Sequence, residues 1–375
     1  MQPVYTMRFP KKYVFGEGAL DQIGQHLVPL GKKFLLLTGC GPITEEVTNR
    51  IRQSVAEVDG GSGCELIFED VDTQPPTLAC VTQLGERVKK DGIDVVVGIG
   101  GGRALDIARG QEHYSKSKVA LVATSAATNA VGTRIQVIFA DDSCTTLGPI
   151  HLSDTMTELV LIDSGLVVKA PPRTLSAGFG DAFASAYEGL TSAKKFDDYR
   201  DSSFAWAILE DGLDTFYSEG LQAMDAAKAG VVTPAYNHVI EHIMFANGMG
   251  TSNLRGGMSL PHLIGDGTLM FLETEEHRFM HGHLVGYGVL PMMVERNFPL
   301  EEIYRYVDFM QAVEVPVNFG QLGIQDFSRD KLYALCEKSM ESMVLKLTRN
   351  VITPQDIFKN MMAADSIVNT YLASK

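Results

Sequence analysis

The chain has 375 residues, enough for two or three domains of ordinary size. Its composition, with 45% hydrophobic and 21% charged residues, is that of a globular protein. The formal net charge of −14 disfavours nucleic acids and anionic membrane surfaces as partners, because both would repel the chain.

Cysteine usage and the apolar segments predict a cytoplasmic protein without a membrane partner. The longest apolar stretches, such as 95–99 and 159–162, are far shorter than the ~20 residues of a membrane span. The first residues contain no apolar core of a secretory signal. The cysteines are odd in number and form no CxxC pair, which is typical of reduced thiols; they are Cys40, Cys64, Cys80, Cys144 and Cys336.

Residues 1–172 alternate between short apolar runs and helical stretches, which indicates parallel βα units. Unbroken runs of branched apolar residues are typical of strands that helices cover on both faces. The predicted strands are 34–38, 65–68, 95–99, 119–122 and 159–162, and a helix is expected to begin near Thr44. We therefore predict an α/β N-terminal domain with a parallel sheet.

A glycine run, Gly98 to Asp106 (GIGGGRALD), follows the third predicted strand and opens a predicted helix. Glycines let a backbone approach a phosphate closely, and a helix N-terminus offers free N–H groups and a positive dipole end. A glycine-rich turn that only joins strand and helix has the same composition, but the strand before and the helix after favour a phosphate site. The run does not match GxxxxGK[ST], and it lies too far along the chain for the usual first-strand dinucleotide fingerprint.

After Pro171 and Pro172 the pattern becomes helical, with methionine, alanine and leucine at helical spacing. Helices are predicted over 187–221, 235–249 and 332–347. Another is predicted to begin at Thr353, because Thr353 suits an N-cap, Pro354 the first helical position and Asp356 the first turn. We expect an N-terminal α/β domain over 1–172 and an all-helical C-terminal domain over 173–375.

The histidines offer two candidate metal sites. His238 to His242 (HVIEH) fits the H-x-x-E-H pattern of a zinc peptidase. The match spans only five residues, and the same stretch also fits an amphipathic helix that buries Ile240, Ile243 and Met244. We disfavour the peptidase hypothesis.

The second candidate combines His262, which ends the segment GGMSLPH, with His281 in MHGH and Asp181 in GFGD. Two imidazoles and a carboxylate with an open fourth position form a catalytic zinc arrangement. Taken singly, each of these residues is more often structural than a metal ligand, and composition alone does not bring them together.

Several motifs, in order and nearly from end to end, make the chain similar to the iron-dependent alcohol dehydrogenase and dehydroquinate synthase superfamily. Within it the chain resembles the glycerol dehydrogenase-like branch. The motifs are 10–20 (PKKYVFGEGAL), the glycine run with Asp106, 171–188 (PPRTLSAGFGDAFASAYE), 256–267, 281–288 (HGHLVGYG) and 352–365 (ITPQDIFKNMMAAD). Motifs in the right order are far more specific than any one of them.

The resemblance implies a nucleotide-binding N-terminal domain, a helical C-terminal domain and an active site between them. It assigns the metal ligands to Asp181, His262 and His281, and the ligand types favour zinc over iron. The metal would polarise the substrate alcohol and stabilise the alkoxide, from which hydride passes to the nicotinamide of NAD or NADP. The resemblance to the family also implies a homo-oligomer, either a dimer or a larger assembly. His277 and His283 receive no role. The predicted cofactor contacts are Gly39, Gly100, Gly101, Gly102, Arg103, Asp106, Thr124, Thr133, Ile135 and Phe139.

Two departures from the family concern the cofactor. Gly39 stands where the family often carries an aspartate that binds the adenosine ribose hydroxyls and disfavours a 2′-phosphate. Its absence removes a repulsion, so NADP(H) becomes tolerable. Arg103 replaces the lysine that usually ends the glycine run, which keeps the charge but changes the geometry.

Two more departures concern the substrate and the proton. Asn129 replaces the aspartate that contacts the substrate hydroxyls in the glycerol-specific pattern, and with Arg134 nearby it permits an anionic substrate, although Arg134 also fits a surface position. Gly265 replaces a histidine that family members often use in a proton relay. Asp266 and His283 are the candidates to replace it.

We therefore expect a dehydrogenase or carbonyl reductase that acts on a small alcohol or polyol other than plain glycerol. One alternative is a lyase or cyclase like dehydroquinate synthase, which the small number of basic residues around the ligand motifs disfavours. Another is a nucleotide-binding relative without catalysis. The missing relay histidine favours it, but the intact set of Asp181, His262 and His281 argues against it.

Overall fold

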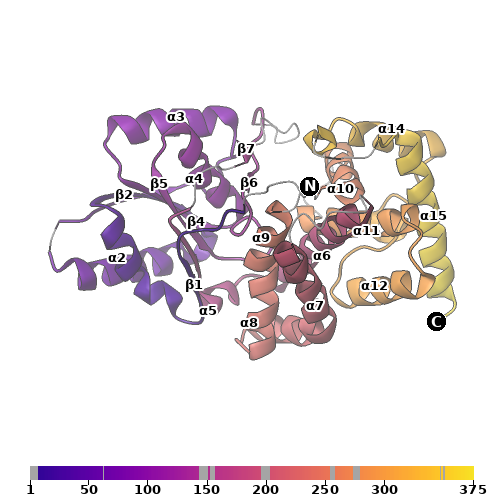
Figure 1. Cartoon of the computed structure of the whole chain (residues 1–375), viewed down its shortest axis with the longest axis horizontal. Helices are drawn as coiled ribbons and strands as arrows, with labels where there is room; N and C mark the ends of the chain where they lie inside the picture. The colour runs from indigo at the N-terminus through magenta and orange to yellow at the C-terminus, as the bar shows by residue number, and fades with distance from the viewer. Residues whose placement is uncertain are drawn as a thin grey trace.

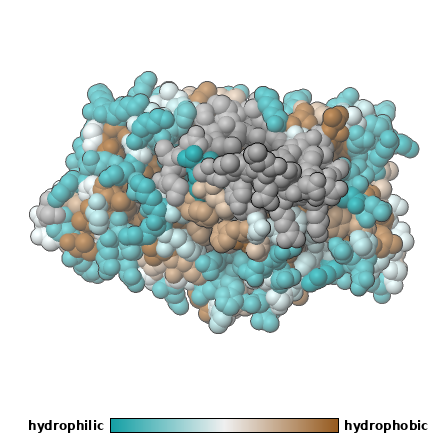
Figure 2. Space-filling model, viewed as in Figure 1, coloured by the Kyte–Doolittle hydropathy of each residue, from teal (hydrophilic) through white to brown (hydrophobic). Residues whose placement is uncertain are grey.

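The computed structural model describes residues 7–61, 63–142, 151–152, 157–195, 203–253, 258–272, 279–346, 348 and 351–375. Figure 1 shows two parts side by side: a sheet with its helices, and a group of helices in which α15 lies at the far end from the sheet. Hydrophilic residues cover most of both ends of the molecule on the face shown in Figure 2, as the net charge of −14 leads one to expect.

Six parallel strands form one sheet in the order β1-β8-β5-β4-β2-β3. All five predicted strands are confirmed. The sixth, β1, is only three residues long and partly exposed, so its apolar pattern carried too little signal. The strands are β1 (Tyr13–Phe15), β2 (Lys33–Gly39), β3 (Glu65–Asp70), β4 (Val95–Gly100), β5 (Lys118–Ala123) and β8 (Leu159–Ile162).

Alternate residues of each strand face opposite helical layers, as the strand period of two requires. Leu36 and Val97 pack with Val47 of α2 (Thr44–Asp59), whereas Leu35 and Val96 belong to the core of α3 (Leu78–Lys90) and α4 (Gly102–Tyr114). The sheet is therefore buried on both faces, which explains its unbroken apolar runs. Shorter elements complete this part: η1 (Ala19–Gln22), α1 (Ile23–Leu27), η2 (Val28–Leu30), η3 (Gly41–Ile43) and α5 (Ser164–Val167).

The strand order places a topological switch point between β2 and β4. The chain leaves β2 towards β3 on one side and leaves β4 towards β5 on the other. In open parallel sheets, ligands bind at the carboxyl ends of two such strands. Here those ends are Gly39 and Gly100, which pair directly. A short antiparallel pair, β6 (Ile135–Gln136) with β7 (His151–Leu152), was not predicted from the sequence.

The second part of the chain is helical, as predicted. Its first helix begins at Pro172, and we propose a domain boundary at this point. The elements are α6 (Pro172–Lys195), α7 (Ser203–Ala229), α8 (Pro234–Glu241), the π-helical turn η4 (His242–Ala246), α9 (Asn247–Ser252), α10 (Leu260–Phe271), α11 (His281–Glu295), α12 (Leu300–Ala312), α13 (Phe319–Leu322), α14 (Arg329–Ser339), η5 (Met343–Lys346) and α15 (Pro354–Ala373).

Two predicted helices have wrong bounds. The single helix expected over 187–221 is two helices, α6 and α7, which pack against each other through Leu190, Trp206 and Leu209. The helix expected over 332–347 ends at Ser339, and a 3-10 turn follows at 343–346. After Ser339, Met340, Val344 and Leu345 still pack against the core, so hydrophobic spacing alone overextends this second helix.

Two other predictions are confirmed. Residues 235–249 lie in one helical run made of α8, η4 and α9. Helix α15 starts with a capping box, in which Thr353 Oγ1 accepts from Asp356 N and Asp356 Oδ2 accepts from Thr353 N. The cysteines are free at the described positions 40, 64, 80 and 336, while Cys144 lies outside the described residues. Among the described residues, no helix is long and apolar enough to span a bilayer.

Candidate metal centre and cofactor cleft

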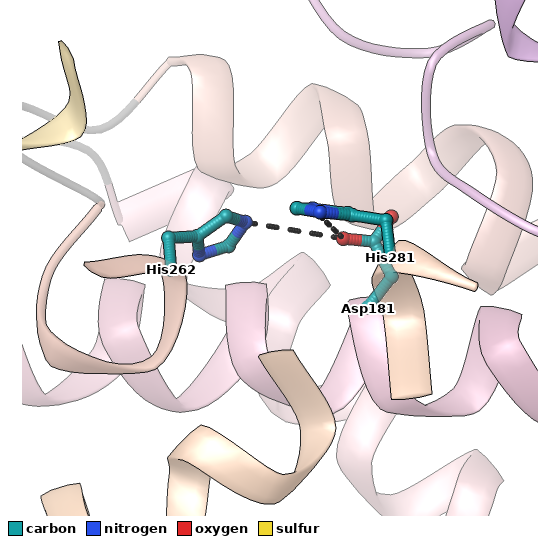
Figure 3. Close-up of side chains that lie close together, drawn as sticks. All are labelled: Asp181, His262 and His281. Atoms are coloured by element: carbon teal, nitrogen blue, oxygen red, sulfur yellow. Dashed lines mark ion pairs between the residues drawn. The ribbon is translucent and has the colours of Figure 1, made fainter. Parts of the chain in front are cut away.

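Asp181, His262 and His281 come together, each from a different helix (Figure 3). Asp181 Oδ1 lies 3.9 Å from His262 Nε2 and 4.0 Å from His281 Nε2. The three donor atoms lie within 4.8 Å of one another, and over the described part of the chain this is the one group of three such side chains close enough to hold a metal ion. Asp181 and His262 are buried, whereas the side chain of His281 is 44% exposed.

The donor set fits a divalent ion. One carboxylate and two imidazoles leave a coordination position open, as catalytic zinc sites do. Donors ~2.1 Å from a tetrahedral ion lie ~3.4 Å apart. The separations here, 3.9 and 4.0 Å from Asp181 and within 4.8 Å for the whole set, are wider, so the side chains would move inward to bind an ion.

Glycines bring the ligand-bearing helices close together. A Cβ at Gly180 of α6 would lie 2.0 Å from the carbonyl oxygen of Gly282 in α11, and a Cβ at Gly282 would lie 1.9 Å from the carbonyl oxygen of Ala177. Because no side chain larger than hydrogen fits at either position, the two backbones touch. Asp181 and His281, the sequence neighbours of this contact, therefore lie face to face.

Glu188 holds His262 in place and was not singled out from the sequence. It lies on α6, it is fully buried, and its Oε2 accepts from His262 Nδ1 at 2.7 Å. Its Oε1 accepts from the backbone N–H of Ser259 at 2.8 Å. These bonds leave His262 Nε2 facing Asp181. The signal was available, because a residue seven positions after Asp181 is two turns further on the same helix face.

The carboxylates around His262 change its protonation. Burial alone lowers the pKa of His262, but the charges of Glu188 and Asp181 outweigh burial and raise this pKa to about 9. Without an ion the imidazole is therefore a cation at neutral pH, and an ion would take the place of its Nε2 proton.

Replacing Glu188 with glutamine should weaken metal binding. The amide keeps the size of the side chain but cannot pull the Nδ1 proton of His262 as a carboxylate does. We expect the dissociation constant for Zn²⁺, measured by competition with a chromogenic chelator, to rise about 10- to 100-fold. The matched control is Glu219→Gln, which removes the partly exposed acidic partner of His238 and should leave the constant unchanged. Equal constants for Glu188→Gln and wild type would contradict the role given to Glu188.

A cavity of about 320 Å³ connects the metal group to the sheet. Its walls come from the start of α4, the loop after β5, β6 and the helices α6, α10 and α11. The predicted site residues that line it are Gly102, Arg103, Asp106, Asn129, Thr133, Ile135, Phe139, Asp181, His262 and His281.

The other predicted cofactor residues do not line this cavity and lie at the strand ends beside it. Gly39 pairs with Gly100, Thr124 N donates to the carbonyl oxygen of Gly100 at 3.1 Å, and Gly101 is the N-cap of α4. A Cβ at Gly100 would meet the carbonyl oxygen of Gly39 at 2.4 Å, and φ there is +150°. Position 100 therefore requires glycine for a structural reason as well.

Asp106 joins α4 to β6. Its Oδ1 accepts from Val137 N at 3.3 Å, and its carbonyl oxygen accepts from Gln136 Nε2 at 3.0 Å. Burial raises the pKa of Asp106 to about 7, against the opposing effects of Arg109 and the Val137 N–H. The residue therefore shapes the cavity wall besides facing the cavity.

Asn129 connects the loop after β5 to the metal group. Its backbone N–H donates to Asp181 Oδ2 at 3.1 Å, which leaves Oδ1 for the histidines. Its side-chain Nδ2 donates to Ser185 Oγ at 3.1 Å. Since one amide hydrogen bond is used within the protein, Oδ1 of Asn129 is the acceptor available to a substrate.

Arg134 does not reach the substrate cavity. It lines a separate cavity of about 30 Å³ together with Arg8 and Arg109. The hypothesis that Arg134 and Asn129 together recognise an anionic substrate is therefore wrong about Arg134.

Packing explains the missing relay histidine. A Cβ at Gly265 would lie 2.5 Å from Val285 Cγ1 and 3.1 Å from Val285 N, so α10 and α11 leave no room for an imidazole. His283 is buried as a cap of α11: its Nδ1 accepts from Met280 N at 3.0 Å and its Nε2 bonds Ser176 Oγ at 3.2 Å.

His283 is not the replacement relay. Burial and the charge of Arg173 lower its pKa to about 4, and it does not line the cavity. Asp266 does line the cavity, where its Oδ2 accepts from Ser342 Oγ at 2.5 Å. Of the two candidates, only Asp266 stays. His277 lies outside the described residues.

The H-x-x-E-H segment is an amphipathic helix. His238 is exposed and pairs with Glu219 at 3.0 Å, and His242 pairs with Asp211 at 3.1 Å. The side chain of Ile240 is fully buried. The two histidines thus contact acidic side chains of α7, burial lowers the pKa of His242, and the decision against a peptidase agrees with their positions.

A parallel sheet with a glycine-rich helix start, facing a His₂Asp metal group across one cavity, defines the class of metal-dependent dehydrogenases. Comparison with known proteins agrees. The family model of iron-containing alcohol dehydrogenase matches residues 10–164. Glycerol dehydrogenase of Pseudomonas putida is 28% identical over 372 residues, which cover 98% of this chain and 99% of that protein.

Two further similar proteins are also glycerol dehydrogenases or probable glycerol dehydrogenases. Glycerol dehydrogenase of Citrobacter freundii is 30% identical over 295 residues, which cover 76% of this chain and 78% of that protein. The crystal structure of a probable glycerol dehydrogenase from Sinorhizobium meliloti 1021 superposes with a TM-score of 0.85 at 25% identity, covering 98% of this chain and 99% of that one. The chain belongs to the iron-containing alcohol dehydrogenase superfamily, in its glycerol dehydrogenase-like branch, and is an NAD(P)-dependent oxidoreductase acting on alcohols.

Proposed function

We propose that this enzyme transfers a hydride between a small neutral hydroxy compound other than plain glycerol and the nicotinamide of its cofactor, as a dehydrogenase or, in reverse, a carbonyl reductase. The observation that carries the proposal is a single cavity with two kinds of wall. His262 and His281 line it on one side, and Gly102 and Arg103 at the start of α4 line it on the other. A dinucleotide bound at α4 can therefore meet a substrate held at the metal group.

Different residues of the chain bind the cofactor, hold the metal, orient the substrate and accept its proton. The free N–H groups and positive end of α4, with Arg103 beside them, bind the cofactor diphosphate. Asp181, His262 and His281 hold the metal, which supplies a Lewis acid for the hydroxyl or carbonyl oxygen of the substrate. The amide oxygen of Asn129 orients a substrate hydroxyl. The carboxylate of Asp266 accepts the hydroxyl proton, and Ser342 Oγ donates to that carboxylate.

The charges of the cavity favour a neutral substrate. Outside the metal ion and its ligands, the described lining holds three carboxyl groups, those of Asp106, Asp266 and Glu341, against one arginine, Arg103; burial raises the pKa of Asp106 to about 7. Arg103 is assigned to the cofactor, so no arginine or lysine of this lining is left for a carboxylate or phosphate on the substrate. Like charges at a binding site act against anionic compounds.

A substrate panel tests the proposal through the absorbance of NADH and NADPH. We expect neutral polyols or hydroxycarbonyl compounds to exceed glycerol in kcat/KM, because an amide replaces the carboxylate that suits the hydroxyls of glycerol. Hydroxy acids and polyol phosphates should fall at least about tenfold below the best neutral compound, since an unpaired buried charge costs more than ~1.4 kcal/mol.

The panel separates the alternatives. Glycerol equal to or better than every other compound would contradict the substrate assignment, and absence of any net change in NAD(P)H across the panel would contradict hydride transfer. Zinc as the metal, a cytoplasmic location and assembly into a dimer or higher homo-oligomer stay predictions.

A further inference from the structure

Three strand ends lie side by side at the edge of the sheet next to α4. Gly39 at the end of β2 pairs with Gly100 of β4, and the preceding Thr38 pairs with Asp70 of β3. The pairing continues one residue further, because Val71 N donates to the carbonyl oxygen of Thr38 at 2.8 Å. The loop after β3 therefore starts directly beside the end of β2.

Asp72, the second residue of that loop, brings a carboxylate to the end of β2. A Cβ at Gly39 would lie 3.9 Å from Asp72 Oδ1, and a Cβ at Gly41 would lie 4.0 Å from Asp72 Oδ2. Asp70 helps to place it, since Asp70 Oδ1 accepts from Asp72 N at 2.8 Å. Asp72 is exposed to solvent. Although β2 itself ends without an acidic residue, a carboxylate stands next to it.

The first turn of α4 lies next to the end of β2. Ala104 Cβ would be 3.0 Å from a Cβ at Gly39. A dinucleotide whose diphosphate binds the start of α4 carries its adenosine ribose next to that turn, over the ends of β2 and β3. The ribose hydroxyls are donors, and a carboxylate is the acceptor that pairs with two neighbouring hydroxyls.

We propose that Asp72, supplied by β3, binds the adenosine ribose in place of the carboxylate that β2 lacks, and so directs this enzyme to NAD(H) over NADP(H). The inference rests on the proposed dehydrogenase function and deepens it by naming the cofactor. It reverses the expectation drawn from Gly39 alone, which considered one strand end without its neighbour.

The charges of the two segments around the ends of β2 and β3 also favour NAD(H) over NADP(H). From 34 to 49 and from 65 to 86 the chain carries no lysine or arginine. The next cation, Arg50, pairs with Asp163 at 2.8 Å and with Asp21 at 2.7 Å. The first turn of α2 adds Glu45 and Glu46. A 2′-phosphate would thus meet carboxylates without a cationic partner from these segments, and like charges placed together discriminate strongly.

Isothermal titration of the metal-loaded enzyme with NADH and with NADPH tests the inference by binding alone. We expect wild type to bind NADH at least about tenfold more tightly. Asp72→Asn removes the charge but keeps the size, so it should shrink the ratio of the two dissociation constants by about tenfold, with NADH weakened and NADPH strengthened. Asp330→Asn, on α14 far from the sheet in Figure 1, loses the same charge and should keep the wild-type ratio.

The outcomes are distinct. Equal binding of both dinucleotides by wild type, or an unchanged ratio in Asp72→Asn, overturns the assignment of Asp72 while the dehydrogenase function stands. Failure of both dinucleotides to bind wild type overturns the proposed function and this inference with it. Melting temperatures of the two variants confirm that each is folded, which is expected because both side chains are exposed.

Discussion

Replacing His262 with alanine should remove the metal and lower kcat/KM by about 10³-fold, since Lewis-acid stabilisation of the transition state is worth several kcal/mol and each ~1.4 kcal/mol is tenfold in rate. The loss has a second cause. Glu188, which is fully buried, would keep its charge without the imidazole partner. Breaking such a buried pair costs about 3–5 kcal/mol of folding stability.

The measurements for His262→Ala are metal content by mass spectrometry, steady-state rates and thermal melting. The control is His238→Ala, in which the exposed histidine of the H-x-x-E-H segment is replaced; it should keep metal, rate and melting temperature. Metal and activity that survive in His262→Ala would refute the ligand assignment. Loss of both in His238→Ala would revive the peptidase-like site.

Introducing one methyl group at Gly180 should damage both folding and metal binding. In Gly180→Ala the new Cβ would meet the carbonyl oxygen of Gly282 at 2.0 Å, so α6 and α11 must separate. Overpacking of this kind costs about 1–3 kcal/mol, and here the clash is with backbone, which cannot rotate away. Because Asp181 and His281 flank the contact, we also expect the Zn²⁺ dissociation constant to rise at least about tenfold.

Chemical denaturation and metal titration measure the two effects of Gly180→Ala. The matched control is Gly320→Ala on α13, where the nearest atom to the new Cβ is 3.4 Å away. Its unfolding free energy should change by less than about 1 kcal/mol. If Gly180→Ala matched this control in both measurements, the close approach of α6 and α11 would not be what sets the metal group.

Most strands of the sheet could be predicted because strands buried on both faces consist of unbroken runs of apolar residues. Strand β1 escaped because three partly exposed residues carry no such run. Helix ends were predicted where a capping residue marks them, as Thr353 does. The end of α14 was missed because Met340, Val344 and Leu345 continue the apolar spacing past Ser339 and no capping residue stands out.

The candidate site, too, could be predicted only in part from the sequence. The positions of Asp181, His262 and His281 came from motifs, but their distances depend on glycine contacts between helices far apart in the sequence. Glu188 was missed because its spacing from Asp181 places it on the same helix face but does not identify His262 as its partner. Asp72 escaped because it acts on the neighbour of its own strand, and strand order is a property of the folded sheet.

The packing around Gly265 limits which substitutions the chain can accept at this position. Val285 occupies the space that a histidine at 265 would need. A mutation that restored the imidazole alone would disrupt the contact between α10 and α11, and one that shortened Val285 alone would leave a cavity. Both changes are therefore needed together, and we expect each single change to lower the free energy of unfolding. The contact between α10 and α11, and not only the chemistry of the site, therefore keeps glycine at position 265.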